Sequence, residues 1–249
     1  MLRRALHSVL AIVVLMTGII VGVGATAGTA HAVACRTWSN LPLEPGESNE
    51  DVRQLQIRVA GWVASGERLS YDGVYGARTE AAVRRFQEAY NLDVDGVAGT
   101  QTITKINQLS DSDCTPIHFS YAELNQCNST WAGGAVSAAT AKSNALRTMW
   151  KLEAIRHKLG DNPITVSSGF RSDACQPSDS APTSRHRFGD AADLTAGTVA
   201  GRCAFAVRGK TSGFSEILGQ GYEGHNDHTH LAHDPSPFWS APGCASYGF

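Results

Sequence analysis

Histidine and aspartate side chains gather in the C-terminal third of this 249-residue chain, where five of its nine histidines lie beyond residue 185. One group, SRHRFGDAAD at residues 184–193, supplies His186 and Asp193, and the other is HNDHTH at residues 225–230. Imidazole and carboxylate are ligands that Zn2+ prefers, and a catalytic zinc site takes three protein ligands and one water molecule. The two groups therefore indicate a zinc site. A structural metal site, or surface histidines in a polar loop, are the alternatives.

The elements that carry these residues must bring them together. Alternation along a strand points His228 and His230 to the same face of a sheet. Asp193 follows a pair of alanines, which is typical of a buried strand whose end delivers a carboxylate. Gly189 permits a turn between His186 and Asp193. We therefore expect an α+β fold in which a small antiparallel sheet carries the site.

Three ordered motifs narrow this interpretation. They are SGFRS at residues 168–172, the pattern S-x-H-x-x-G-x-A-x-D at residues 184–193, and an aspartate three residues before the last histidine of H-x-H at residues 227–230. Together they resemble the M15 family of zinc peptidases, the D-Ala-D-Ala carboxypeptidases and dipeptidases. The resemblance covers about residues 137–249 and is greatest to the secreted zinc D-Ala-D-Ala carboxypeptidases of actinomycetes.

The resemblance also implies a role for each site residue. It implies that one Zn2+ ion is held by three ligands, namely His186, Asp193 and His230. Asp227 occupies the position of the general base, which takes a proton from the attacking water. His225 stands where related enzymes have a further catalytic histidine, a proton donor or a group that stabilises the oxyanion.

Three further residues are expected to contact substrate. Arg171 has a planar guanidinium suited to a substrate carboxylate or a developing oxyanion, and a structural salt bridge is its alternative role. Ser184 belongs to the zinc motif and is expected to bind substrate. His228 either supports a zinc ligand or contacts substrate.

The N-terminal segment is typical of a secretory signal peptide. Arg3 and Arg4 precede an apolar run over residues 9–23, and small residues follow up to Ala32. The expected cleavage is after Ala32 or Ala34. A retained membrane anchor is the alternative, but the run is short for a span of about 20 residues. We expect an extracellular, cell-wall-associated protein that is not bound to a membrane after cleavage.

Six cysteines lie beyond the expected cleavage site: Cys35, Cys114, Cys127, Cys175, Cys203 and Cys244. An even number in an exported chain favours three disulfides, for which 15 connectivities are possible. We favour pairing of neighbours, because Cys35 and Cys114 then bracket one compact unit. The remaining pairs would be Cys127–Cys175 and Cys203–Cys244.

The bracketed unit contains an internal repeat. Three helices are expected, over residues 52–59, 79–87 and 100–109. The second and third follow the same turn, DGVYG at residues 72–76 and DGVAG at residues 95–99. The Asp-Gly pair supplies a tight turn, and we expect Thr79 and Thr100 to cap the helices that follow. This pattern by itself predicts a small three-helix fold.

The repeat, together with L-Q-x-x-V and the T-x-x-A-V-x-x-F-Q pattern of the second helix, resembles the peptidoglycan-binding domain of bacterial cell-wall hydrolases. The resemblance covers about residues 46–109 and implies a non-catalytic module that holds an enzyme near the cell wall. A structural helical domain without a ligand is the alternative.

These patterns divide the chain into four parts: a signal peptide over residues 1–32, a peptidoglycan-binding-like helical domain over 33–113, a linker over 114–136 and a zinc peptidase domain over 137–249. A core helix is expected at about residues 137–159, with lysine and arginine opposite its apolar stripe.

Composition excludes some functions and is silent on others. A hydrophobic fraction of 42% excludes a disordered chain, and a formal net charge of −2 argues against a dedicated nucleic-acid binder. We expect a monomeric zinc carboxypeptidase that releases D-alanine from the D-Ala-D-Ala terminus of peptidoglycan peptides. The alternatives are a peptidoglycan cross-bridge endopeptidase and a catalytically silent wall-binding protein.

Overall fold

The computed structural model describes residues 35–178 and 180–249, so the expected signal peptide lies outside the described residues. The α-helices are α1 (Glu50–Arg58), α2 (Ala77–Ala89), α3 (Thr100–Gln108), α4 (Tyr121–Leu124), α5 (Ala138–Lys158) and α6 (Val199–Gly209). The strands are β1 (Thr165–Ser168), β2 (Ala191–Thr195), β3 (Glu216–Leu218), β4 (Thr229–Ala232) and β5 (Phe238–Ser240). Short 3-10 helices are η1 (Asp173–Cys175), η2 (Arg185–Phe188) and η3 (Pro242–Tyr247). No helix in the described ranges is long and apolar enough to cross a bilayer.

In the helical region, residues 36–113, a buried glutamine holds each copy of the repeated turn. Gln56 donates to Asp72 Oδ1, Val74 O and Thr79 Oγ1 at 3.0–3.2 Å, and its Oε1 accepts from Gly73 N at 2.9 Å. The buried amide therefore satisfies polar groups of the turn and ties the turn to the helix that follows.

The second turn repeats this arrangement around Gln87, which bonds Asp95, Val97 and Thr102 in the same way. The expected caps were wrong. The N-caps of α2 and α3 are glycines that make no side-chain cap bond. Thr79 is turned inward to its glutamine, and Thr100 is the first residue of α3.

Helix α5 belongs to two hydrophobic clusters. Met149, Leu152 and Ile155 pack in the cluster that also contains residues of the sheet, whereas Trp150 and Ala154 pack with α1, α2 and α3. The expected helix at about residues 137–159 is confirmed, with Ser137 and Leu159 as its caps. The side of the helix opposite the apolar stripe is partly buried, however. Three charged residues of the helix are buried there: Lys151, Glu153 and Arg156.

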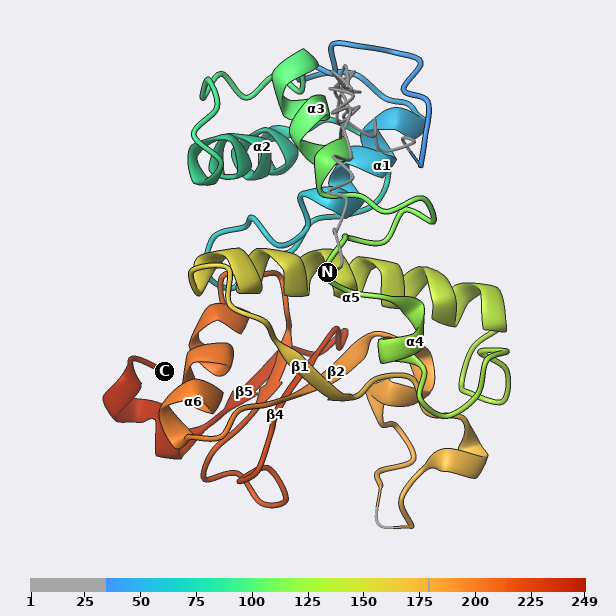
Figure 1. Ribbon diagram of the computed structural model, residues 1–249, viewed down its shortest axis with the longest axis vertical. Helices are drawn as coiled ribbons and strands as arrows, with labels where there is room; N and C mark the ends of the chain where they lie inside the picture. Colours follow the sequence, from blue (N-terminus) through green and yellow to red (C-terminus); the bar gives the residue numbers. More distant parts are fainter. Residues whose placement is uncertain (1–34, 179) are drawn as a thin grey trace, which may run out of the picture. The chain divides into compact units, whose positions relative to one another are not determined.

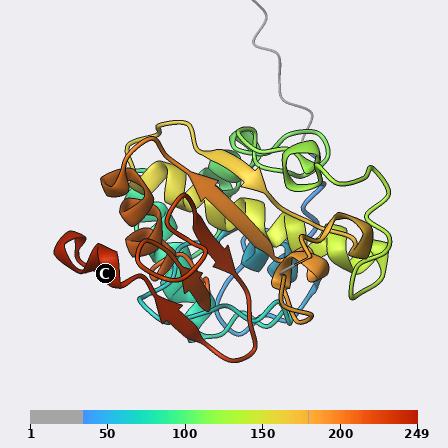
Figure 2. The same ribbon diagram turned by 90° about the horizontal axis from the view of Figure 1, so that it is seen from below.

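The α+β class is confirmed, and the sheet is mixed. Its strand order is β1-β2-β4-β3-β5. The first three pairings are antiparallel, as expected, but β5 pairs parallel with β3. Figure 1 shows α6 beside the sheet, and Figure 2 shows the strands crossing in front of α5.

Three disulfides link Cys35 to Cys114, Cys127 to Cys175 and Cys203 to Cys244, which is the neighbour pairing expected from the sequence. The first closes the helical region. The second joins the segment after α4 to η1, and the third joins α6 to η3. Each covalent loop restricts the unfolded chain and so stabilises the fold.

Candidate metal centre

The side chains of His186, Asp193 and His230 converge at one buried point. Asp193 on β2 lies directly opposite His230 on the neighbouring antiparallel strand β4, and η2 brings in His186. Asp193 Oδ1 is 2.8 Å from His230 Nδ1 and 3.1 Å from His186 Nε2, and the two imidazole nitrogens are 3.1 Å apart. The structure therefore brings the three expected zinc ligands together.

The turn between η2 and β2 depends on Gly189. Its φ of +75° lies in the left-handed region, and a Cβ there would lie 2.4 Å from the carbonyl oxygen of Ala141 on α5. Any side chain would clash with this helix backbone. The glycine of the zinc motif thus lets the chain pass against α5 and return along β2 with Asp193 facing His186.

The three donor atoms fit a zinc ion. Ligands of a tetrahedral site with radii of about 2.0–2.1 Å are about 3.3 Å apart, close to the 2.8–3.1 Å separations seen among His186, Asp193 and His230. All three donors also lie within 4.8 Å of one another. Two imidazole nitrogens and a carboxylate oxygen are a ligand set typical of zinc.

Neighbouring groups orient both histidines. His186 Nδ1 donates to Gly169 O at 2.6 Å, which leaves Nε2 as the ligand atom. On the other histidine, His230 Nε2 faces Glu216 Oε1 at 3.6 Å, which leaves Nδ1 toward Asp193. Such outer partners fix the tautomer and increase the basicity of a metal-binding histidine.

The electrostatics of the cluster favour a cation. Burial alone would raise the pKa of Asp193, but the charges and hydrogen bonds of His186 and His230 hold it well below its usual range. Burial opposes a charge on His230, yet contacts with Asp193 and Glu216 raise its pKa to about 9. Burial lowers the pKa of His186. A site that stabilises a proton between these groups will also stabilise a divalent cation in its place.

Arg171 makes both a structural ion pair and part of the cleft wall. Its Nη2 donates to Asp193 Oδ2 at 2.6 Å, and its Nε donates to Ser168 Oγ at 2.8 Å. It is one-fifth exposed and lines the cleft above the donor cluster. The salt-bridge role and the substrate-facing role considered from the sequence are therefore compatible.

The remaining histidines lie beside the cluster. His228 Nε2 is 3.8 Å from Asp193 Oδ1, and its Nδ1 bonds Asp227 Oδ1 at 2.7 Å. His225 Nδ1 donates to Glu223 O at 2.8 Å, and burial followed by the charges of nearby histidines lowers its pKa. At neutral pH His225 is therefore an uncharged imidazole with Nε2 free to accept a proton.

Asp227 lies at the protein surface next to His228. Its side chain is 88% exposed, and it reaches the cluster through His228. The hydrogen bond from His228 lowers the pKa of Asp227, which keeps it ionised at neutral pH. Its assignment as the general base stays a prediction.

These groups open into a cleft of about 550 Å³ whose wall includes Ser184, His225 and His228. No role was predicted from the sequence for two charged residues of this wall. Glu216 on β3 supports His230, and Arg185 on η2 pairs with Asp190. Only the pairing of β3 with β4 places Glu216 here.

Comparison with known proteins agrees with these features. The family model described as Peptidase M15 matches residues 117–232, and that of a peptidoglycan binding domain matches residues 48–106. The zinc D-Ala-D-Ala carboxypeptidase of Streptomyces albus G is 56% identical over 230 residues, which cover 89% of each chain.

Two other relatives match a shorter stretch. The spore cortex-lytic enzyme of Bacillus cereus is 42% identical over 67 residues, 26% of this chain and 24% of that protein. The enzyme of the same name from Oceanobacillus iheyensis is 34% identical over 76 residues, 30% of this chain and 27% of that protein. The extent of the similarity to the Streptomyces albus G enzyme, together with the matched model, shows that this chain belongs to the M15 family of peptidases.

Proposed function

We propose that this chain is a zinc D-Ala-D-Ala carboxypeptidase that releases the C-terminal D-alanine of peptidoglycan peptides. The observation that carries the proposal is the convergence of three buried zinc-type donors, His186, Asp193 and His230, at the base of an open cleft. The similarity to the Streptomyces albus G enzyme supports the substrate class.

The metal and the side chains divide the chemistry between them. When bound, Zn2+ supplies Lewis-acid polarisation of the scissile carbonyl and makes water a better nucleophile at neutral pH. Arg171 is held by Asp193 and Ser168, so its remaining N–H groups are fixed in orientation. We assign to them the substrate carboxylate, because a planar guanidinium suits this group.

For proton transfer we propose His228 in place of the predicted base, Asp227, because Asp227 is exposed and bonds His228. Asp227 then positions His228. The bond from His228 Nδ1 to Asp227 leaves Nε2 as the acceptor on the side that faces Asp193. His228 then takes a proton from the attacking water, and the same proton can pass to the leaving amine. His225 presents a second neutral acceptor beside it.

The helical region is proposed to keep the enzyme at the cell wall, and its likeness to peptidoglycan binding domains supports this role. We also propose domain boundaries near residues 113 and 137. We further propose that the protein has a signal peptide, is secreted and is monomeric. Three disulfides suit an oxidising, extracellular compartment.

Matched substrates test the proposed reaction. The zinc-loaded protein is incubated with diacetyl-Lys-D-Ala-D-Ala, with the same peptide ending in D-Ala-L-Ala, and with cross-linked wall fragments. Release of D-alanine from the first peptide alone is the expected result. Cleavage restricted to the cross-linked fragments would indicate an endopeptidase, and no cleavage of any substrate would indicate a wall-binding protein.

A double-mutant cycle tests the proton-transfer assignment. If Asp227 acts through His228, then Asp227→Asn and His228→Gln each lower kcat, and the double variant is no slower than His228→Gln alone. Zinc content serves as the control, because neither residue is assigned as a ligand. Losses that multiply in the double variant would show that the two side chains act independently.

A further inference from the structure

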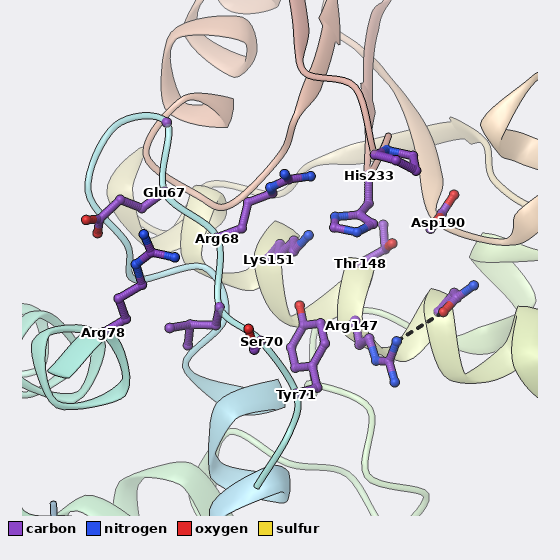
Figure 3. A pocket seen from close by; sticks show the side chains of 14 residues that line it. Glu67, Arg68, Ser70, Tyr71, Arg78, Arg147, Thr148, Lys151, Asp190 and His233 are labelled. Carbon is purple, nitrogen blue, oxygen red and sulfur yellow. Dashed lines mark hydrogen bonds between the residues drawn. The ribbon is translucent and has the colours of Figure 1, made fainter. Parts of the chain in front are cut away.

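A second cavity, of about 630 Å³, lies between the loop at residues 66–71, helix α5 and the segment that follows β4 (Figure 3). It shares no lining residue with the metal cleft. Its volume is within the range of about 300–1,000 Å³ that is usual for small-molecule sites.

Cationic side chains enter this cavity from two walls. Arg68 and Arg78 come from the helical region, and Arg147 and Lys151 come from α5. In Figure 3 the side chains of Arg68 and Lys151 point toward the same space beside His233. Contributions from separate elements make this a built cavity and not a run of surface charge.

Acidic groups do not balance these cations. Among the described residues that line the cavity, the acids are Glu67 and Asp190. Asp190 is already paired, because both of its carboxylate oxygens accept hydrogen bonds from Arg185. The cavity therefore has a net positive charge.

Lys151 brings a charge without an ion-pair partner to the wall of this cavity. It is 4% exposed, and within the described ranges its ammonium makes no hydrogen bond or ion pair. Its Nζ lies 5.0 Å from the centroid of the Phe214 ring. Arg147 Nε, on the same wall, is buried without a hydrogen-bond partner in the described ranges. Unpaired cationic groups around a cavity favour an anion there.

The pKa values of two residues that line the cavity also indicate a positive electrostatic potential there. Burial lowers the pKa of Lys151 to about 8; the charge of Asp190 opposes this shift, and the charges of Arg68 and Arg147 add to it. Burial, and then the charges of Lys151 and Arg68, lower the pKa of His233 to about 3. His233 is thus neutral, and its buried Nδ1 has no hydrogen-bond partner in the part of the chain that the structure describes. A bound anion would relieve both effects.

We propose that this cavity binds a carboxylate-bearing part of the peptidoglycan strand, at a site separate from the metal cleft. The inference rests on the proposed function for the identity of the polymer. The two cavities lie on either side of one ion pair, because Arg185 lines the metal cleft and Asp190 lines the cationic cavity. In the cationic cavity, Arg147 and Lys151 are the groups that hold the carboxylate.

Binding to the zinc-loaded protein tests the proposal by calorimetry. The probe is a muramyl tripeptide, which carries free carboxylates but lacks the D-Ala-D-Ala terminus, and the comparison probes are its amidated form and inorganic phosphate. We expect Arg147→Gln/Lys151→Met to weaken tripeptide binding by about tenfold or more. Arg84→Gln/Lys105→Met removes the same charge elsewhere and should leave binding unchanged. Arg78→Gln, at an exposed position, should weaken binding without a risk to folding.

Three results would overturn the proposal: no binding of the tripeptide to the wild-type protein, equal binding of the amidated probe, or tripeptide binding unchanged in both the double variant and Arg78→Gln. If phosphate binds as tightly as the tripeptide, the cavity is a site for small anions and not for a peptidoglycan carboxylate. D-alanine release from diacetyl-Lys-D-Ala-D-Ala is measured in parallel and should be unchanged in the variants. Failure of the wild-type protein in that assay would refute the proposed function whatever the binding result.

Discussion

The substitution Glu216→Gln removes the negative charge beside the proposed zinc ligand His230 and leaves the size of the side chain almost unchanged. Glu216 Oε1 is 3.6 Å from His230 Nε2, and one-fifth of its side chain is exposed. Two unit charges at this distance interact by about 5 kcal/mol at an effective dielectric constant of about 20. Exposure and the greater distance to the metal reduce this value. Losing such a partner typically weakens metal binding by about 10- to 100-fold, or about 1.4–2.7 kcal/mol.

Competition with a chelator of known zinc affinity measures this effect. Glu223→Gln is the matched control, because Glu223 lines the same cleft but is exposed on its rim. We expect weaker zinc binding in Glu216→Gln, near-wild-type binding in the control, and recovery of most activity at saturating zinc. Unchanged affinity in Glu216→Gln, or equal losses in the two variants, would refute the role given to Glu216.

Three further predictions concern other parts of the molecule. The pKa of Lys151 is about 8 in the folded protein but about 10.4 in an unfolded chain, so the unfolded state holds more protons between these values. The unfolding free energy should rise with pH there, by up to about 1.4 kcal/mol per pH unit, and urea titrations should show a smaller rise in Lys151→Met. Arg171→Lys should retain zinc but lower kcat/KM by about 10²-fold or more, because an ammonium cannot reproduce the fork geometry, as steady-state assays can check. Gln87→Leu should destabilise the fold by about 2–4 kcal/mol, since it removes the partner of the buried Gly96 N and Thr102 Oγ1. The exposed Gln101→Leu should change the midpoint of thermal unfolding little.

The sequence predicted the parts of the site that are coded by local spacing. His186 and Asp193 share one motif, and His230 ends another. To predict that the three meet, one need only assume that the strands carrying Asp193 and His230 pair. Glu216 had no such signal, because it acts only through the register of β3 against β4. The outward position of Asp227 was equally hidden, since it depends on the bond to His228.

The fold shows the same division. The periodicity predicted the long helix α5, but it could not show that the helical region would cover the charged side of that helix. The close packing requires a glycine at position 61, because a Cβ there would lie only 2.4 Å from Ala154 Cβ on α5. The repeated turns were visible at their 23-residue spacing, but the buried glutamines that hold them, Gln56 and Gln87, come from different positions along the preceding helices.

The central claim is that one zinc ion held by His186, Asp193 and His230 is required for release of D-alanine. The most direct test adds zinc stepwise to metal-free protein and follows D-alanine from diacetyl-Lys-D-Ala-D-Ala. We predict that activity rises to a plateau at one equivalent of zinc, and that Asp193→Ala neither binds zinc tightly nor releases D-alanine. Full activity of the chelated protein without zinc, or tight one-to-one zinc binding by Asp193→Ala, would contradict the account.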